Sequence, residues 1–257
     1  MAFLTLAQGD PIGRDLLKKL VLARYGSSPP AMDTLRVTYR GRTRATLGPF
    51  PLWARVEAVA TYRFPLHMRW DFRVRVLRLL SSSYTTAFDG EAVYEQHGLR
   101  VTRITEVEQV ESARRRAWSE TVFFVSPLIA NERVRVEGID LSAFRAFLTD
   151  YPDDVATVRL SENHRMREIE IERLDPADGL RKRQFIRPLG ELTRVDGLIL
   201  PERIQRFWDG EMFMELSPVA VVLNPELEAD TFTLREETIS DILREDEDAE
   251  SDEETAS

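Results

Sequence analysis

Residues 195–223 read VDGLILPERIQRFWDGEMFMELSPVAVVL, and the fold is decided in this stretch. Two Asp-Gly dipeptides, Asp196-Gly197 and Asp209-Gly210, separate runs that are rich in aliphatic and aromatic residues. Asp-Gly between such runs is among the strongest local signals for a β-hairpin, because a type I′ turn needs positive φ at both central residues. We therefore expect three consecutive antiparallel strands joined by two tight turns.

The same dipeptide occurs at Asp89-Gly90 and at Asp178-Gly179. Around the first of these the sequence FDGEAVYE closely matches the later WDGEMFME, so acidic residues are doubled as well. Such a pair could be two catalytic carboxylates, a metal site or two turns. Hairpin tips explain all four Asp-Gly dipeptides, whereas catalysis explains at most two of them. We interpret all four as turns and expect Glu91 and Glu211 to be solvated.

Strict alternation of apolar and polar residues predicts that one face of the sheet is dry. The clearest example is MRWDFRVRV at residues 68–76, where one face carries Met68, Trp70, Phe72, Val74 and Val76 and the other carries Arg69, Asp71, Arg73 and Arg75. This period of two is typical of an antiparallel sheet with one buried side. About ten strands are predicted, most with short connections, so the sheet must close into a barrel or wrap around something to hide its apolar face.

Three segments have helical spacing. Residues 10–26 place leucines at helical intervals between an Asp10-Pro11 start and a Gly26 stop. Residues 110–130 contain a second helical pattern, and residues 141–148 a weaker one. The predicted fold class is therefore mainly β (α+β): a strongly curved antiparallel sheet, or incomplete β-barrel, with helices lidding the open side.

Charge is concentrated at the C-terminus. Residues 241–257 carry nine acidic side chains against the single Arg244, or −8 of the total −9 of this 257-residue chain, which leaves the body near −1. A self-repelling acidic segment with few apolar residues is predicted to be disordered. We divide the chain into an N-terminal segment at 1–11, which could be a signal-peptide remnant, a single domain at 12–240 and a disordered acidic tail at 241–257.

Familiar catalytic and ligand-binding motifs are absent from the sequence. It has no cysteine, no glycine-rich phosphate loop, no Gly-x-Ser-x-Gly and no His-Glu-x-x-His, and its three histidines are far apart. No apolar run approaches the length of a transmembrane segment, and a body near −1 provides no general field for nucleic acid. We expect no catalytic residue, metal or cofactor, and a protein that is not an enzyme.

Two stretches resemble a known family. FDGEAVYEQHG starts at Phe88 and places an aromatic residue soon after aromatic-Asp-Gly, and residues 195–232 follow the pattern dGl-x-lP-x-xi, dG, l-x-x-v-x-v-N-x-x-l-x-x-x-x-F. Both resemble the LolA/LolB-like superfamily, the outer-membrane lipoprotein carrier and receptor fold. The resemblance covers about residues 12–235, and its motifs are short and mostly structural.

The resemblance implies an incomplete barrel whose apolar concave face holds acyl chains. The candidate pocket-lining residues on strands are Trp70, Phe72, Val74, Val93, Met212 and Met214, and the candidate lid residues are Trp118, Val122 and Val125. For each of them the alternative is that the side chain fills an ordinary core. Methionine suits either role because its side chain is adaptable.

Two functions remain open from the sequence. The first is a carrier-like protein that binds a lipid or acyl chain, in outer-membrane lipoprotein or lipid trafficking, with a lipid, an acylated protein or an envelope protein as partner. It would reside in the periplasm or cell envelope, or in the cytoplasm if Met1 is the true start. The alternative is a protein-interaction module with a filled core, which binds through an exposed edge or the acidic tail.

Overall fold

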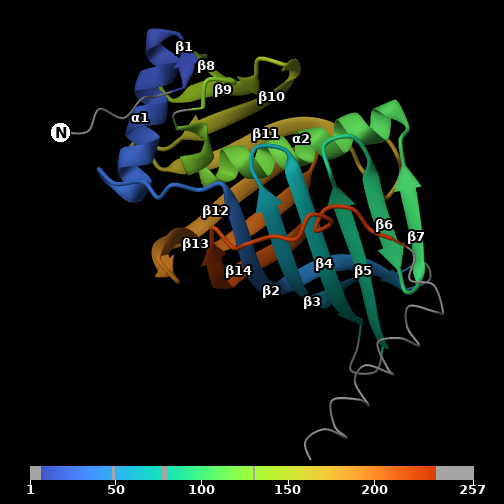
Figure 1. The fold of residues 1–257 in the computed structure, drawn as a ribbon. Helices are drawn as coiled ribbons and strands as arrows, with labels where there is room; N and C mark the ends of the chain where they lie inside the picture. The colour runs from blue at the N-terminus through green and yellow to red at the C-terminus, as the bar shows by residue number, and fades with distance from the viewer. Residues whose placement is uncertain (1–6, 48–49, 77–79, 130, 236–257) are drawn as a thin grey trace, which may run out of the picture.

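A computed structural model describes residues 7–47, 50–76, 80–129 and 131–235 (Figure 1). In chain order its elements are β1 (Gln8–Gly9), α1 (Pro11–Tyr25), β2 (Thr34–Leu47), β3 (Phe50–Arg63), β4 (His67–Val76), β5 (Leu80–Phe88), β6 (Val93–His97), β7 (Arg100–Ile104), α2 (Val107–Phe124), the 3₁₀ turn η1 (Ser126–Leu128), β8 (Val134–Gly138), β9 (Ala143–Leu148), β10 (Tyr151–Leu160), β11 (Met166–Leu174), β12 (Arg181–Val195), β13 (Leu198–Trp208) and β14 (Glu211–Leu223).

All of these strands form one curved sheet. Its order is β1-β8-β9-β10-β11-β12-β13-β14-β2-β3-β4-β5-β6-β7, and every pair is antiparallel except β1 with β8. Two meanders, β2–β7 and β8–β14, are joined side by side where β14 pairs with β2. The outermost strands, β1 and β7, do not pair with each other, so the sheet is an open half-barrel, as the sequence predicted.

The helix α2 connects the two meanders across the concave face. The chain leaves the sheet at β7 on one edge and re-enters at β8 near the other, so its connection must span the hollow of the sheet (Figure 1). A helix of 18 residues is about 27 Å long, which suits this crossing. Ten of the α2 residues between Ser112 and Phe124 are buried. The helix therefore fills the concave face instead of lying on the surface.

The first helix has the boundaries that the sequence predicts. Asp10 is its N-cap and accepts a hydrogen bond from the Gly13 amide at 2.7 Å. The other Asp10 oxygen accepts from the Gly138 amide of β8 at 2.9 Å, so the cap also attaches α1 to the sheet. The helix ends at Gly26, which has φ 69° and donates to the Leu22 carbonyl. A side-chain cap and a terminal glycine explain both boundaries.

All four Asp-Gly dipeptides connect consecutive antiparallel strands, but only two have the predicted type I′ geometry. Both central residues have positive φ at Asp196-Gly197 and at Asp209-Gly210. At Asp89-Gly90 and Asp178-Gly179 only the glycine does. There the aspartate accepts from downstream amides instead: Asp89 from Glu91 at 2.9 Å and Ala92 at 2.8 Å, and Asp178 from Leu180 at 3.0 Å. Side-chain hydrogen bonding thus replaces the second left-handed residue.

The weak helix expected at residues 141–148 is wrong. Residues 143–148 form β9, in which Phe144, Ala146 and Leu148 are buried and Arg145 is exposed. This segment is short enough to fit either period, and pairing with β8 and β10 on its two sides decides for the strand. The described residues therefore contain two α-helices and fourteen strands, where the sequence suggested three helices and about ten strands.

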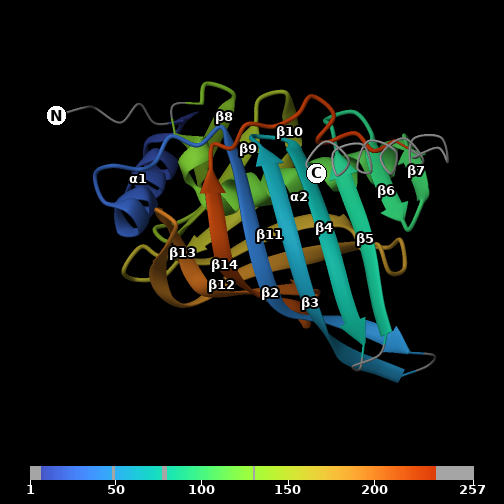
Figure 2. The ribbon, with the colours of Figure 1, turned by 60° about the horizontal axis from the view of Figure 1, so that its bottom comes forward.

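After β14 the chain crosses the outer face of the sheet, the face turned away from α2 (Figure 2). Phe232 is buried and its ring lies 5.5 Å from the ring of His67. Leu234 packs on a small cluster of Ala87, Ala92 and Tyr94 in the β5–β6 hairpin. This segment covers the ends of β4–β6 from outside. The predicted acidic tail at 241–257 lies outside the described residues.

The junction between the meanders yields a testable prediction. Gly41 of β2 pairs with Leu216 of β14, and a Cβ at this glycine would overlap the Glu215 carbonyl oxygen. We expect Gly41→Ala to lower the free energy of unfolding by about 1–3 kcal/mol, because backbone atoms cannot move aside as a flexible side chain would. Urea denaturation measures this, with the exposed Ser83→Ala as control. Equal stability of the two variants would contradict the close approach at this junction.

Candidate functional site

Three of the predicted pocket residues lie together under α2. Trp70, Phe72 and Val74 alternate along β4 on the concave face, and they are 1%, 5% and 9% exposed. The rings of Trp70 and Phe72 belong to a stack with members on four strands. In order it contains Tyr39–Trp70 (5.5 Å between ring centroids), Trp70–Phe72 (5.3 Å), Phe72–Tyr84 (4.6 Å) and Tyr84–His97 (5.8 Å). We call these five residues the aromatic ladder.

The predicted lid residues point elsewhere. Trp118, Val122 and Val125 are fully buried at α2 and its C-terminal end. The Trp118 indole nitrogen donates to the Ala146 carbonyl of β9 at 3.0 Å, which directs this side chain toward the second meander. They are packed in the same large core as Trp70.

The remaining predicted residues lie apart from one another. Val93 of β6 is half-buried and packs against the main core. Met214 of β14 is buried in that core, whereas its neighbour Met212, close to the β13–β14 hairpin tip, is partly exposed. The nine predicted residues thus do not surround one common space. Eight of them lie at α2 or face the concave side, whereas Met212 pairs with Phe207 on the opposite face of the sheet.

A buried ion pair joins α2 to the sheet. Glu120 of α2 is fully buried and Arg206 of β13 is 4% exposed. The guanidinium donates two hydrogen bonds to the carboxylate, at 2.6 and 3.0 Å, and the Tyr62 hydroxyl donates a third at 3.3 Å. Although burial disfavours its charged form, Glu120 raises the pKa of Arg206 above its usual value. Arg206 is therefore held in its charged form.

Further polar groups extend this pair into a seam along the concave face. Arg173 of β11 and Gln184 of β12 are buried, and the Arg173 Nε donates to the Gln184 side-chain oxygen at 2.9 Å. Arg116 of α2 is half-buried and donates weakly to the Thr86 hydroxyl at 3.4 Å. We call Arg116, Glu120, Arg173, Gln184 and Arg206 the polar seam. It holds three cations and one anion.

Aromatic rings support the arginines of the polar seam. The guanidinium carbons of Arg116 and Arg206 lie 5.4 and 5.3 Å from the centre of the Trp70 ring, and that of Arg173 lies 4.6 Å from the Trp208 ring. Such cation–π contacts stabilise a desolvated guanidinium by roughly 1–2 kcal/mol. Trp70 thus belongs to both the aromatic ladder and the polar seam.

Sequence reasoning missed the polar seam, although a signal was present. In three adjacent strands a polar residue takes a position on the inward face that alternation reserves for apolar residues. Arg173 follows Ile169 and Ile171, Gln184 precedes Ile186, and Arg206 follows Ile204. One inward polar residue resembles an irregular strand end. Only the pairing of β11, β12 and β13 shows that the three interruptions are neighbours.

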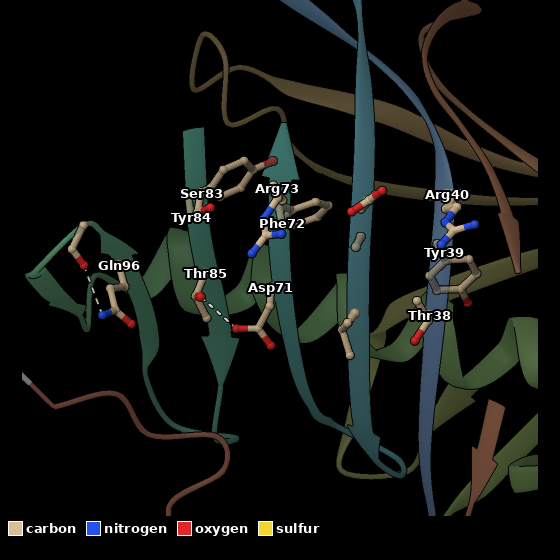
Figure 3. Close-up of a pocket in the computed structure, with 14 residues that line it drawn as sticks. Thr38, Tyr39, Arg40, Asp71, Phe72, Arg73, Ser83, Tyr84, Thr85 and Gln96 are labelled. Carbon is tan, nitrogen blue, oxygen red and sulfur yellow. Dashed lines mark hydrogen bonds between the residues drawn. The ribbon is translucent and has the colours of Figure 1, made fainter. Parts of the chain in front are cut away.

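A separate groove of about 510 Å³ lies on the outer face of β2–β6 (Figure 3). Two rows of side chains flank it, with Thr38, Val59, Asp71, Thr85 and Gln96 on one side and Arg40, Glu57, Arg73 and Ser83 on the other. Its charges balance, and Asp71 is already engaged by Arg69 at 3.0 Å and by the Thr85 hydroxyl at 2.8 Å. Figure 3 views this face with α2 behind the strands.

The described residues contain neither a metal-binding cluster nor a helix that could span a membrane. In residues 7–235 apart from the short gaps, no cluster of three or more histidine, aspartate or glutamate side chains could hold a metal ion. Neither helix in this part of the chain combines the length and apolar composition of a membrane span.

Comparisons with known proteins add the following relationships. Solved structures with a similar arrangement include a putative outer membrane lipoprotein-sorting protein domain from Vibrio parahaemolyticus, at 11% identity and TM-score 0.45 over 85% of this chain and 95% of the other. A LolA superfamily protein from Nitrosomonas europaea matches at 14% identity and TM-score 0.47, over 86% and 97%. A DUF1329 family protein from Desulfovibrio piger matches at 11% identity and TM-score 0.47, over 87% and 97%.

The sequence comparisons identify the family. Among curated protein sequences no match is found. Residues 22–214, which run from the end of α1 into β14, match the family described as "Family of unknown function (DUF6544)". Because this match covers most of the sequence, the chain belongs to the DUF6544 family.

Proposed function

We propose that this protein is a non-enzymatic, carrier-like protein that binds a lipid or acyl chain between α2 and the concave face of its half-barrel. The observation that carries this proposal is the placement of α2 across the aromatic ladder of an open sheet. An open sheet leaves an apolar face that some other group must cover. In this protein a single helix covers it, and a helix can be displaced more readily than a paired strand.

We infer the ligand's entrance from the uneven contacts of α2. The helix packs chiefly on β10 and β11 of the second meander. Its Arg114 and Arg115 both bind the buried Asp154, at 2.5 and 2.7 Å. Toward β5 the described side-chain hydrogen bonding is the weak contact from Arg116 to Thr86. We therefore place the entrance between α2 and the β4–β5 side, where Phe72, Val74 and Tyr84 lie on the inward face of the sheet.

The free energy of acyl-chain burial can be compared with the cost of separating the buried ion pair. Burial of about fifteen CH₂ groups stabilises a complex by roughly 12 kcal/mol. Separation of a buried ion pair such as Glu120–Arg206 costs about 3–5 kcal/mol. The gain exceeds this cost and leaves part of the energy to offset the other contacts that α2 gives up.

The sequence motifs agree with this function. The aromatic-Asp-Gly stretch at Phe88 and the pattern over residues 195–232 resemble the LolA/LolB-like superfamily, and a role in outer-membrane lipoprotein or lipid trafficking follows by analogy. With that role we propose a periplasmic or cell-envelope location, and a lipid or an acylated protein as partner.

The second candidate is a protein-interaction module with a filled core. The observation in its favour is the outer groove between Arg40 and Gln96, a hollow of about 510 Å³ on the face away from α2. The tight burial of Trp118 and Val122 is also compatible with a permanent core. The two candidates differ in whether the concave face ever opens to an acyl chain.

Acyl binding can be tested on the purified full chain. We expect native mass spectrometry to show bound lipid, and a fluorescent fatty acid to bind saturably. Val74→Trp should weaken fatty-acid binding by at least about tenfold, equivalent to roughly two buried CH₂ groups, because its ring fills the entrance beside Phe72. The control is Arg73→Trp, the next residue, which lies on the outer face. A lipid-free mass with no fluorophore response would refute the carrier and leave the interaction module.

The attachment of α2 gives a second prediction. We expect Glu120→Ala to lower the free energy of unfolding by about 3–5 kcal/mol, because it leaves Arg206 buried without its counter-ion. Removal of Glu211, whose pair with Arg44 has a similarly short contact of 2.7 Å but is solvent-exposed, should cost less than about 1 kcal/mol. Chemical denaturation of both alanine variants compares them. A small effect of Glu120→Ala would mean that the buried pair does not hold the helix.

A further inference from the structure

We propose that the ligand carries an oxyanion, a carboxylate or a phosphate, which binds to Arg116, Arg173 and Arg206 of the polar seam. The inference rests on the acyl-binding function proposed above and specifies the chemistry of the ligand's polar end. The apolar part of the ligand would then lie along the aromatic ladder, which meets the polar seam at Trp70.

The charges of the polar seam do not balance. Three arginines share one carboxylate, Glu120, and Arg206 already takes both of its oxygens. Arg173 has no acidic hydrogen-bond partner among the described residues; its Nε binds the neutral Gln184. Buried charges are normally paired, because an unpaired one loses its hydration without compensation. An anion with two negative charges would neutralise the excess of two cations, and an anion with one would halve it.

Three buried donors, two in the polar seam and one on Trp70, have no acceptor among the described residues. Within the part of the chain that the structure describes, the buried Arg206 Nε, Gln184 Nε2 and Trp70 Nε1 atoms have no hydrogen-bond partner. Gln184 and Arg206 are 1% and 4% exposed, so their donors are not turned toward bulk solvent. All three groups are N–H donors. A group that offers several acceptor oxygens, as carboxylate and phosphate do, matches this arrangement.

The electrostatics of the buried arginines point the same way. Burial lowers the pKa of Arg173 well below its usual value, and repulsion from Arg116 and Arg206 lowers it further. Burial also lowers the pKa of Arg116, although Glu120 partly opposes this effect. Both guanidiniums are therefore held charged at an energetic cost that a nearby oxyanion would reduce.

Arg116 offers a route by which an oxyanion can reach the polar seam. Arg116 is the half-buried member of the polar seam, and it lies beside the proposed entrance between α2 and β5. An oxyanion that arrives there meets Arg116 first and Arg206 on the same aromatic ring, since both guanidiniums lie within 5.5 Å of the Trp70 ring centre. The arginines of the outer groove differ from these, because Arg40 and Arg73 are exposed and keep their hydration.

Matched pairs of ligands test the inference on the wild-type full chain. Oleate is compared with oleyl alcohol, and 1-oleoyl-lysophosphatidate with monooleoylglycerol, below their micelle concentrations at pH 8 and low salt. We expect the anionic member of each pair to bind about tenfold more tightly, as one or two charge-assisted hydrogen bonds would give. We also expect that added KCl reduces this preference.

Variants then assign the preference to residues. Arg116→Gln should reduce the oleate-to-alcohol ratio to about threefold or less, because it removes the charge at the entrance. Arg73→Gln removes an equal charge from the outer face of β4 and should leave the ratio unchanged. Arg173→Gln is the deeper second test, and circular dichroism verifies that each variant is folded. If the ratio persists in both folded seam variants, the assignment is overturned.

The remaining outcomes separate the two proposals. Equal binding within both ligand pairs overturns the oxyanion site and leaves the acyl-binding function intact. Failure of all four ligands to bind refutes the acyl-binding function and this inference with it. Inorganic phosphate is titrated alone. If it binds as tightly as lysophosphatidate, the site belongs to a free anion and the link to an acyl ligand is overturned.

Discussion

The structure depends on one constraint: a one-sided apolar sheet that does not close must cover its concave face. Antiparallel hairpins with strict alternation produce the apolar face, and the missing pairing between β1 and β7 leaves it open. The topology then makes α2 the cover. A chain that finishes one meander at β7 and begins the next at β8 has to cross the hollow between them (Figure 1). The helix that connects the two meanders is therefore also the cover of the concave face.

A buried ion pair holds α2 on the sheet, although apolar contacts would have been enough for stability alone. Replacement of a buried ion pair by packed apolar residues is often neutral or stabilising. Glu120 and Arg206 instead fix where along the sheet the helix lies, since a shift by one turn would separate two directional hydrogen bonds. The polar seam therefore combines two properties: it sets the register of α2, and its two further arginines exceed what that register requires.

Local chemistry in the sequence was sufficient for the elements but not for their assembly. The helix at residues 11–25 and the hairpins at Asp196 and Asp209 follow from caps, turn residues and period, and their boundaries agree with the structure. Residues 141–148 fit two periods, and only their neighbours in the sheet made them β9. The pairing of β14 with β2 joins residues more than 170 positions apart, and no local signal encodes it.

The candidate site likewise combines features that the sequence predicts with features that only the assembled sheet shows. Burial of Trp70, Phe72 and Val74 follows from alternation, whereas the stacking of Trp70 on Tyr39 depends on sheet order. The polar seam draws its residues from α2, β11, β12 and β13, so it exists only after the helix has crossed the sheet. Each of its members looks like an isolated irregularity in the sequence. A functional site assembled from such interruptions is invisible until the strands that carry them are known to be neighbours.

A filled core and a binding site are compatible when the filler is a movable helix. In that arrangement the free energy that holds α2 in place is subtracted from the intrinsic affinity for the ligand. A ligand whose oxyanion pairs with Arg116 and Arg173 would compensate charges that the closed state leaves without an acidic hydrogen-bond partner among the described residues, so part of the opening cost would be recovered at the polar seam and not along the acyl chain. The closed state would then reject purely apolar molecules, which can fill the concave face but cannot satisfy its donors. Selectivity would arise from the same buried arginines that make the closed core imperfect.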